Sequence, residues 1–585
     1  MTQRLTAAIT VHPSQPAPSS ARPARWAWVL LLVLGWLGQT ALRLWLVRGQ
    51  TVPLAVPDEP AYLIAARVMA GGATDNFSYS TLYPSGYPLL FTPLFWFSHF
   101  AHNPAAAYRA VLNINAPIGA LLLPLGYVAG RRLELSRGLA YSVAMVTALL
   151  PAGLFYTEFA MTDAIYPVLV LAWLLSTHTW LTGRTARACY LGAAGSGLLA
   201  GYLWAVHSRG LVIVAGYLVV GLLVWIRYIA PRGTLIVAAG GLLASALPGW
   251  LLNRYLASQL YPNGARSLSG EAKLRLDHVH GVVLVIEMAF GQLWRFTLDG
   301  WGVAAIGFAA AVYVLLRTAA PWDLRIMAGL AIGITLVIGI TAPAALPPDE
   351  AGGWVGGRYL DCMITALFIP GCVVLLRADW RRILAAAATV VPLTIITAVV
   401  VYAYAGSSIP TAGFGGGFTA AEPAVLTQNW TSANVLLATG VAFALLALWV
   451  VSARFSRVVV VAGLGLVSLL AVLQLTSHVS RGSERTAAAD TTGFISSTGL
   501  KPGERLAIGT GLTWSDWMPQ AYQVWWAPLQ FFNPATQGPP PGTSVVELAW
   551  PAGQPAQASW PTVPPGWHIV ATDGQLGWVA WRSTS

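Results

Sequence analysis

The sequence predicts a polytopic α-helical membrane protein that ends in a small α/β domain. Of the 585 residues, 56% are hydrophobic and only 9% are charged, and the mean hydropathy is +0.63. A soluble chain of this length does not have that composition. The hydrophobic residues form runs of membrane-spanning length. From about residue 477 onward, the composition becomes polar and rich in Pro and Trp.

About thirteen hydrophobic runs of roughly 18–25 residues follow one another along the chain, and each is long enough to cross a bilayer. Residues 1–25, rich in Ala, Pro and Ser, are predicted to be a disordered cytoplasmic tail. The first run lacks a clear cleavage site and is too long for a signal peptide, so it is predicted to stay as an anchor. The predicted spans are 26–48, 108–130, 138–156, 162–182, 188–206, 210–227, 234–256, 300–317, 324–343, 359–377, 382–404, 432–452 and 457–476.

The basic residues set the predicted orientation. The net charge is +11, which a nucleic-acid-binding protein could share, but here the charge is spread over short loops between apolar runs. Alternate loops carry the arginines, for example Arg131 with Arg132 and Arg377 with Arg381. By the positive-inside rule these loops and the N-terminus are cytoplasmic. The C-terminal domain is then extracytoplasmic, and no nucleic-acid partner is expected.

The loops on the other side are long and chemically varied. The first, 49–107, is expected to hold an amphipathic helix over 60–70 and an aromatic stretch over 89–100 that lies in the membrane interface. A fourth outer loop is predicted over 257–298, and a sixth, over 405–431, is rich in Gly and is expected to be mobile.

The C-terminal region, 477–585, is predicted to form the α/β domain. Residues 505–511 and 544–550 have strand patterns, and 516–526 have a helical one. Two further strands, 568–571 and 576–581, flank the turn sequence of residues 572–575. The many Trp residues there could stack on sugars, but core and interface packing is the favoured explanation.

The stretch Val56-Pro57-Asp58-Glu59-Pro60 follows the first span directly. Two adjacent carboxylates beside a membrane face, in a chain with so few charges, suggest a general base or a cation site at the mouth of a cavity. The same acidic, Pro-rich composition is typical of a helix N-terminus. The two interpretations are compatible, and the residues alone do not separate them.

Other polar groups come from outer loops far apart in sequence. A carboxylate can accept a proton from a hydroxyl acceptor, and a guanidinium can hold a lipid-linked phosphate, so these groups could converge on one cavity. Each also has a simpler explanation: Glu158 could be solvated at a span end, Thr162-Asp163 could cap a helix, and His207-Ser208-Arg209 could be a turn with a snorkelling side chain. The groups considered are Asp58, Glu59, Glu158, Asp163, Arg209, Arg266, His278 and Arg358.

Metal binding and disulfide formation are not favoured. Asp277-His278-Val279-His280 has the residue types of a metal site but lacks a partner cluster elsewhere in the sequence. A divalent cation is therefore possible but not supported, and no cofactor is predicted. The three cysteines lie in or beside apolar runs, so no disulfide is expected.

The pattern of the first 230 residues or so resembles the GT-C superfamily of integral-membrane glycosyltransferases. The resemblance is to the bacterial protein-mannosyltransferase and aminoarabinose-transferase-like group. It rests on Asp58-Glu59 with Tyr62 in the first outer loop, on Tyr83-Pro84-Ser85-Gly86-Tyr87-Pro88 after it, on Glu158 and Asp163 in the next, and on Arg209 in a later turn.

The resemblance implies a GT-C-like transmembrane domain over 26–476 and an inverting transfer of a sugar from a polyprenyl-phosphate donor. It implies that Asp58 is the catalytic base with Glu59 beside it, and that Arg209 contacts the donor phosphate. Glu158 and Asp163 match the second acidic loop, which would face the acceptor.

His207 and Arg358 are also predicted to bind the donor phosphate. The Gly-Gly-Arg358-Tyr359-Leu360-Asp361 segment looks like related actinobacterial-type membrane transferases. The sequence lacks a Trp-Trp-Asp-Tyr-Gly motif, which argues against an oligosaccharyltransferase.

These observations together predict a glycosyltransferase of a bacterial plasma membrane that acts on an envelope glycan, lipid or protein. Two other classes stay open: a transporter or flippase of lipid-linked envelope precursors, and a non-catalytic envelope-assembly protein. A transporter should carry ionisable residues within spans and on both faces. Here the acidic groups gather on one face, which favours the enzyme.

Overall fold

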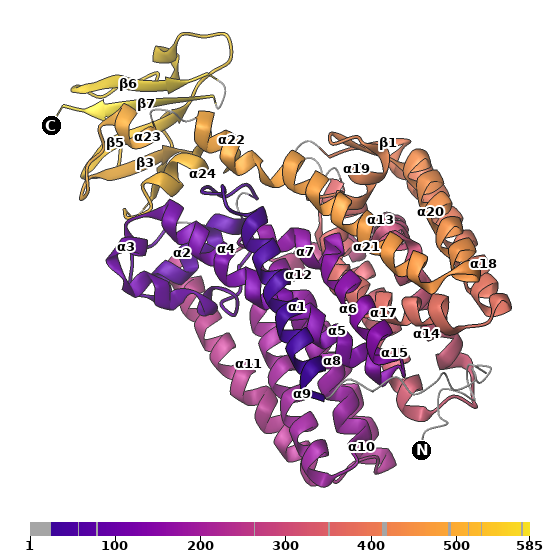
Figure 1. Ribbon diagram of the computed structural model, residues 1–585. Helices are drawn as coiled ribbons and strands as arrows, with labels where there is room; N and C mark the ends of the chain where they lie inside the picture. Colours follow the sequence, from indigo (N-terminus) through magenta and orange to yellow (C-terminus); the bar gives the residue numbers. More distant parts are fainter. Residues whose placement is uncertain are drawn as a thin grey trace.

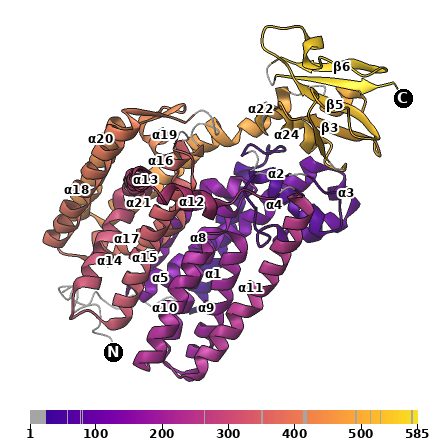
Figure 2. The same cartoon turned by 180° about the vertical axis from the view of Figure 1, so that it is seen from behind.

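The computed structural model describes residues 25–55, 58–75, 77, 80–262, 264–348, 351–411, 418–489, 493–512, 514–527, 529–574 and 577–584. A bundle of long helices stands beneath a small sheet-containing domain at one end, here called the sheet end (Figures 1 and 2). Residues 1–24 of the predicted tail, Val56 and Pro57 of the acidic stretch, and residues 412–417 of the predicted sixth outer loop lie outside the described residues. Arg25 begins the first helix.

The helices match the predicted spans closely. In the described part of the chain, ten helices are long and apolar enough to cross a membrane, and eleven if the pair Arg137–Leu149 and Pro151–Glu158, bent by 73°, is one span. The two remaining predicted spans form α8 and α17, each 17 residues long, which is the lower end of the length that spans a bilayer. The chain is therefore a multi-pass membrane protein.

The long helices are α1 (Arg25–Leu46), α4 (Pro104–Ala120), α5 (Leu122–Arg132), α6 (Arg137–Leu149), α8 (Tyr166–Thr182), α9 (Ala186–Val206), α10 (Gly210–Arg227), α11 (Gly233–Leu260), α13 (Val279–Leu298), α14 (Val303–Leu316), α15 (Trp322–Ala345), α17 (Asp361–Arg377), α18 (Trp380–Ala405), α20 (Val435–Phe455) and α21 (Arg457–Leu475). Several begin at a side chain that accepts a hydrogen bond from the first turn, as Asn103 does for α4 and Thr185 for α9. Such caps satisfy backbone N–H groups that have no partner within the helix.

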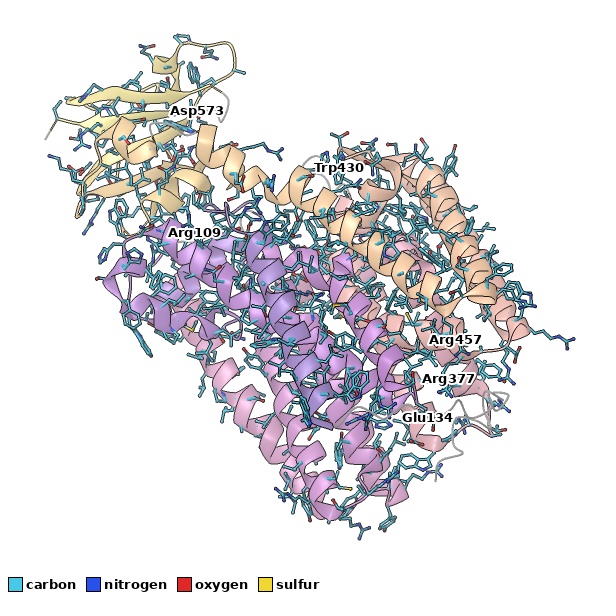
Figure 3. All side chains as sticks on the ribbon, viewed as in Figure 1. Arg109, Glu134, Arg377, Trp430, Arg457 and Asp573 are labelled. Carbon is cyan, nitrogen blue, oxygen red and sulfur yellow. The ribbon has the colours of Figure 1, made fainter. Side chains whose placement is uncertain are left out.

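Loops that the sequence assigns to opposite sides lie at opposite ends of the bundle. Arg377 and Arg457 lie at the end away from the sheet, whereas Arg109 and Trp430 lie at the same end of the bundle as the sheet (Figure 3). This separation agrees with the loop alternation that the sequence predicts, and it sets the arginine-rich loops opposite the C-terminal domain.

The first outer loop folds into short helices beneath the C-terminal domain. They are α2 (Asp58–Met69), η1 (Pro88–Leu90), η2 (Thr92–Trp96) and α3 (Ser98–Ala101). The helix predicted over 60–70 is confirmed. The prediction that it is amphipathic is wrong, because Arg67 is buried together with the apolar residues Leu63, Ile64 and Val68. The aromatic stretch, by contrast, leaves Trp96 and Phe97 largely exposed, as an interfacial segment would.

The predicted fourth outer loop is the main error in the sequence interpretation. Residues 257–298 are mostly helical: α11 continues to Leu260, and α12 (Leu268–Leu276) and α13 follow. The structure continues the chain from α13 through η5 (Asp299–Gly302) into α14. The polar residues around Asp277 directly precede the apolar segment from Val279 to Leu298, and the whole stretch was therefore predicted to be a loop.

Shorter elements complete the bundle. They are α7 (Pro151–Leu154), η3 (Phe155–Glu158), η4 (Thr162–Ala164), α16 (Ala351–Val355), η6 (Gly357–Tyr359), β1 (Ser408–Pro410), α19 (Ala421–Thr427), β2 (Ser432–Asn434), η9 (Thr476–Ser480) and α22 (Gly482–Ala489). Strands β1 and β2 pair antiparallel; β1 lies in the predicted sixth outer loop, and β2 directly follows that loop, where a span was predicted to begin. The cysteines Cys189, Cys362 and Cys372 are free and buried.

The C-terminal domain contains a five-stranded sheet in the order β4-β3-β5-β7-β6. Strand β3 pairs parallel with β4 and β5, and β7 pairs antiparallel with β5 and β6. The predicted strands and helix of this region are all present. The elements are α23 (Phe494–Thr498), β3 (Arg505–Gly509), α24 (Trp514–Gln523), β4 (Gln530–Phe532), β5 (Thr543–Ala549), η10 (Ala556–Ser559), β6 (Trp567–Asp573) and β7 (Trp578–Ser583).

Candidate active site

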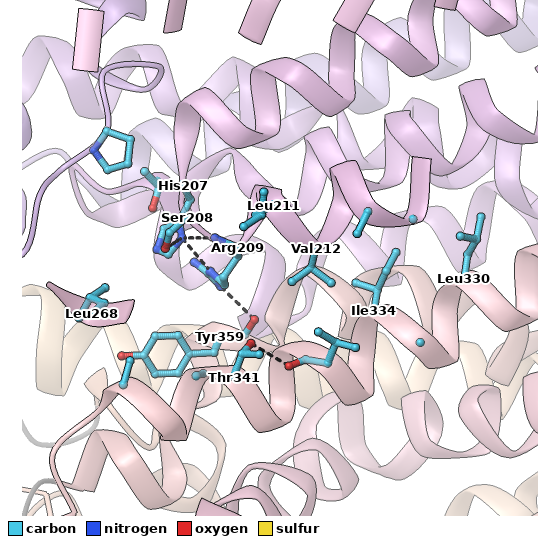
Figure 4. Close-up of a pocket in the computed structure, with 18 of the residues that line it drawn as sticks. His207, Ser208, Arg209, Leu211, Val212, Leu268, Leu330, Ile334, Thr341 and Tyr359 are labelled. Carbon is cyan, nitrogen blue, oxygen red and sulfur yellow. Dashed lines mark hydrogen bonds between the residues drawn. The ribbon is translucent and has the colours of Figure 1, made fainter. Parts of the chain in front are cut away.

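A cavity of about 1540 Å³ opens at the sheet end of the bundle and continues as a groove between α10 and α15. The cavity is polar at the sheet end and apolar along the groove, with Leu211, Val212, Leu330 and Ile334 on the two helices (Figure 4). Arg227 and Arg325 line it at the far ends of these helices. The cavity exceeds the roughly 300–1,000 Å³ typical of pockets for drug-sized ligands. Its shape suits a ligand with a polar head and a long apolar tail.

Asp58 lies at the polar end. It is the first residue of α2, which is also the helix start that its sequence suggested. Tyr83 donates its hydroxyl proton to Asp58 Oδ1 at 2.8 Å, and Arg358 Nη1 donates to Oδ2 at 2.7 Å. The Asp58 side chain remains 16% exposed. An ionised carboxylate has about four acceptor positions, so Asp58 can still accept a proton from a ligand in the cavity.

Arg209 connects two turns at the same end of the cavity. Its guanidinium donates to Asp163 Oδ1 at 2.7 Å and to the backbone carbonyls of Arg358 and Tyr359 at 2.8 and 2.9 Å. Burial alone would lower the pKa of Arg209, but the adjacent Asp163 raises it above the usual value. Arg209 therefore stays charged and ties the turn between α9 and α10 to the turn that carries Arg358.

His207 is held as a neutral hydrogen-bond donor. Its Nδ1 accepts from the backbone N–H of Arg209 at 3.1 Å and from Arg209 Nε at 3.3 Å. Burial, with further contributions from Arg209 and Arg358, lowers the pKa of His207 well below its usual value. Because Nδ1 accepts, the proton of the neutral ring is on Nε2. His207 lines the cavity and can offer that N–H to an anionic oxygen.

Glu59 follows Asp58 but occupies a different environment. Its carboxylate is fully buried and accepts from the backbone N–H groups of Leu54, Ala55 and Ala160 and from the Tyr108 hydroxyl, all at 2.7–2.8 Å. Burial raises its pKa, and these hydrogen bonds oppose the rise. Glu59 does not line the cavity; it joins the entry of α2 to α4 and to the loop after η3.

The two carboxylates of the second acidic loop also occupy different environments. Asp163 lines the cavity and pairs with Arg209, and it does not cap the following helix. Glu158 is fully buried outside the cavity, where the Thr476 hydroxyl donates to its Oε1 at 2.7 Å. The suggestion that Glu158 is simply solvated is therefore wrong. The structure places Asp58, Asp163, His207, Arg209 and Arg358 together, and leaves Glu59 and Glu158 apart from them.

A buried ionic cluster supports the turn that carries Arg358. Arg295 donates to both Asp299 and Glu422, and all three side chains are at most 1% exposed. A Cβ placed on Gly357 would lie 2.6 Å from Arg295 Nη2, so the guanidinium packs directly against that glycine. The sequence does not identify these residues, because Arg295 falls in the predicted fourth outer loop and Asp299 directly after it.

Two further cavity residues were missed. Tyr83 belongs to the Tyr-Pro motif of the first loop, yet its hydroxyl contact with Asp58 depends on the folding of that loop. Tyr359 lines the cavity, and the guanidiniums of Arg358 and Arg209 lie 5.3 and 5.7 Å from the centre of its ring. Within the described residues, no group of three or more His, Cys, Asp or Glu side chains could hold a metal ion, and this includes His278 and His280.

The polar end thus brings together two carboxylates, two arginines and a neutral imidazole above an apolar groove, and Asp58 is the carboxylate that Arg209 does not bind. The carboxylate can accept a proton, and the cationic and N–H groups can hold an anionic head group. The groove can receive an aliphatic chain between α10 and α15.

Comparisons with known proteins bear on the fold. Neither a scan against protein-family models nor a search of the curated proteins gives a match. Among solved structures, the chain is similar to ArnT from Cupriavidus metallidurans bound to undecaprenyl phosphate, with a TM-score of 0.54, 16% identity, and coverage of 95% of this chain and 98% of that chain. ArnT in the apo state gives a TM-score of 0.51 at 18% identity, with the same coverage.

The chain has the GT-C fold. The similarity extends over nearly all of both chains, so it includes the C-terminal domain as well as the first 230 residues on which the resemblance rested. The protein is thus a multi-pass membrane protein with the architecture of GT-C glycosyltransferases, and its polar cavity lies at the sheet end of that architecture.

Proposed function

We propose that the protein is a membrane glycosyltransferase that moves a sugar from a polyprenyl phosphate to a cell-envelope glycan, lipid or protein. The observation that carries the proposal is the pairing of Asp58 with Arg358 at the polar end of a long apolar groove. The groove suits a prenyl chain, and the polar end suits a phosphate and a hydroxyl acceptor. ArnT, which shares the fold, was solved with undecaprenyl phosphate bound.

The proposed step is a single displacement. The acceptor hydroxyl loses its proton to Asp58 while its oxygen forms a bond to the anomeric carbon of the sugar. The bond between that carbon and the phosphate oxygen breaks, and polyprenyl phosphate leaves with the electron pair. Attack from the side opposite the leaving group inverts the anomeric centre.

Two side chains stabilise the departing phosphate in this proposal. Arg358 is positively charged and lies beside Asp58, and the Nε2–H of the neutral His207 can donate to a phosphate oxygen. Arg209 already makes four hydrogen bonds through its guanidinium. In this proposal it therefore acts mainly by fixing Asp163 and the backbone of Arg358.

The proposed setting is a bacterial plasma membrane, with the N-terminus in the cytoplasm and the sheet end outside. The arginine-rich loops at the opposite end support this orientation. Cysteines introduced at Ser136 and Ala535, which are exposed at opposite ends of the molecule, would test it with an impermeant thiol reagent in intact cells. Labelling of Ala535→Cys alone is expected, and labelling of Ser136→Cys alone would reverse the orientation.

The proposed activity is tested with purified protein in detergent and a panel of radiolabelled polyprenyl-phosphate sugars. Release of unlabelled polyprenyl phosphate, with transfer of the label to an envelope extract, is expected for at least one donor. Parallel reactions with EDTA test whether transfer requires a divalent cation, which the sequence leaves possible but does not support. Movement of a lipid-linked sugar across proteoliposomes without any transfer would instead favour a transporter.

A further inference from the structure

Helix α2 carries Asp58 at its first residue and Arg67 in its last turn, about 14 Å apart at a rise of 1.5 Å per residue. Arg67 is buried and does not line the cavity. Its Nε donates to the Ala73 carbonyl at 3.0 Å, and its Nη2 donates to Asp75 Oδ2 at 3.3 Å. The Arg67 and Asp75 side chains are 3% and 2% exposed. No step of the proposed reaction involves this buried ion pair.

The C-terminal domain covers the ion pair. The Arg67 guanidinium lies over the Trp525 ring, 5.4 Å from its centre, and the Leu529 N–H donates to Asp75 Oδ1 at 3.2 Å. Phe95 of the first loop packs edge-on against Trp525, and Tyr522 donates its hydroxyl proton to the Pro104 carbonyl at 2.7 Å. Figure 1 shows α24 directly above α2 and α4.

The entry of α2 is tied to the C-terminal region as well. Ser483 of α22 accepts from the backbone N–H groups of Thr51 and Val52 at 3.0 Å, and its hydroxyl donates to the Val52 carbonyl at 2.7 Å. Glu59 then binds the N–H groups of Leu54 and Ala55. The chain that enters the helix is thus fixed before Asp58 is reached.

Two physical arguments connect these contacts to the site. A helix of 12 residues has little stability of its own in water, so its position depends on its tertiary contacts. A buried ion pair contributes little net stability because desolvating the charges is costly, and its best-attested role is to specify one arrangement. The Arg67–Asp75 pair lies within the first outer loop, and the C-terminal domain contacts both of its members through Trp525 and Leu529. Such a contact is suited to set the position of α2.

We propose that Arg67, Asp75 and Trp525 form a clasp by which the C-terminal domain sets the position of α2, and with it that of Asp58 in the cavity. These are positioning residues, since none touches the cavity. The catalytic consequence rests on the proposed glycosyltransferase function, whereas the structural consequence does not. The clasp would make the C-terminal domain part of the machinery that places the base.

The test uses the full chain in detergent with Trp525→Leu, Trp525→Phe and Trp560→Leu. Trp560 lies in the core of the C-terminal domain among Phe532, Trp567 and Trp581, so its replacement controls for general loosening of the domain. Trp525→Phe keeps an aromatic ring beside Arg67. If Trp525→Leu does not accumulate, Arg67→Lys takes its place, because it keeps the charge but loses the planar fork.

The first measurement is hydrogen exchange at the backbone amides of residues 58–69, which requires no activity. Trp525→Leu is expected to exchange there at least tenfold faster than wild type, with Trp525→Phe and Trp560→Leu close to wild type. Unchanged exchange in folded Trp525→Leu, or an equal effect of Trp560→Leu, would overturn the clasp.

The second measurement is turnover with the active donor. A displacement of about 1 Å can cost about 100-fold in rate, so kcat of Trp525→Leu should fall about 10- to 100-fold while the donor KM stays within about twofold. Faster exchange with an unchanged kcat would overturn the link between α2 and catalysis. If wild-type protein transfers no sugar, the proposed function fails, and the exchange experiment still decides the clasp.

Discussion

Arg358 Nη1 donates a 2.7 Å hydrogen bond to Asp58 Oδ2, although the two residues are 300 positions apart in the sequence. The bond joins the start of α2 to the turn before α17. The polar end of the cavity therefore forms only when the first outer loop and the later part of the bundle pack together. One guanidinium can then contact both the base and the phosphate that leaves during transfer.

Asp58→Asn should remove the proton acceptor while leaving size and most hydrogen bonding in place. A positioned general base contributes about 10²–10⁴-fold in rate, so we expect kcat to fall at least 100-fold with the donor affinity little changed. Asp379→Asn is the matched control. Asp379 caps α18, and Asn is an equally good cap. Turnover near that of wild type in Asp58→Asn would refute the proposed mechanism.

Glu59→Gln should affect folding more than chemistry. The carboxylate accepts four hydrogen bonds, and an amide group would set its own N–H donors against some of those donors. An unsatisfied buried group costs about 1–3 kcal/mol. We expect a lower melting temperature in detergent, with kcat per folded molecule within about threefold of wild type. Normal stability with a large loss of kcat would instead support the catalytic role predicted from sequence.

Arg358→Lys and Arg209→Lys should differ in their effects. Arg358→Lys keeps a charge beside the cavity but loses the planar fork, and a charged hydrogen bond contributes about 1.5–3 kcal/mol. The donor KM should therefore rise about 10- to 100-fold with little loss of stability. Arg209→Lys cannot replace the four hydrogen bonds of the guanidinium, so it should also lower the melting temperature. Equal donor KM values for Arg358→Lys and wild type would exclude Arg358 from phosphate binding.

The sequence was informative about the site wherever a motif and a loop position coincided. Asp58, Arg209 and Arg358 were identified in this way, and all three line the cavity. Adjacency in the sequence was a less reliable guide to which residues line the cavity. Successive residues of a helix point about 100° apart, so Glu59 faces the interior beside Tyr108 while Asp58 faces the cavity.

Contacts that require the whole fold could not be predicted. The Tyr83 hydroxyl reaches Asp58 only after the first loop turns back on α2. Arg67 looked like the polar side of a surface helix because the sequence does not reveal that Trp525 covers it. The helical fold and the strands of the C-terminal domain followed directly from apolar periodicity, whereas α13 was hidden behind a polar segment.

The stability of the protein should depend on pH through His207. The pKa of its ring is well below the usual value in the folded protein and about 6.5 in the unfolded chain. Below pH 6.5 the unfolded state therefore binds more protons, so the free energy of unfolding falls as the pH falls, by at most about 1.4 kcal/mol per pH unit. Buried carboxyls with raised pKa values, such as Asp75, contribute with the opposite sign, so the His207 contribution is the difference between wild type and His207→Gln. In detergent between pH 5 and 6.5, the free energy of unfolding of wild type should fall more steeply with falling pH than that of His207→Gln. Equal slopes in the two proteins would contradict a neutral His207.

Gly357→Ala tests the support beneath Arg358. A Cβ at this position would lie 2.6 Å from Arg295 Nη2 and 2.9 Å from Nε, and Arg295 is held on its other side by Asp299 and Glu422. The turn must therefore move, and Arg358 moves with it.

Gly352→Ala provides the control, because a Cβ there meets nothing within 4 Å although the residue lies in the same glycine-rich stretch. A misplacement of about 1 Å can cost about 100-fold in rate. We expect kcat/KM for the donor to fall 10- to 100-fold in Gly357→Ala and to stay within about twofold in Gly352→Ala. Equal activity of the two folded variants would indicate that the Arg295 cluster does not set the position of Arg358.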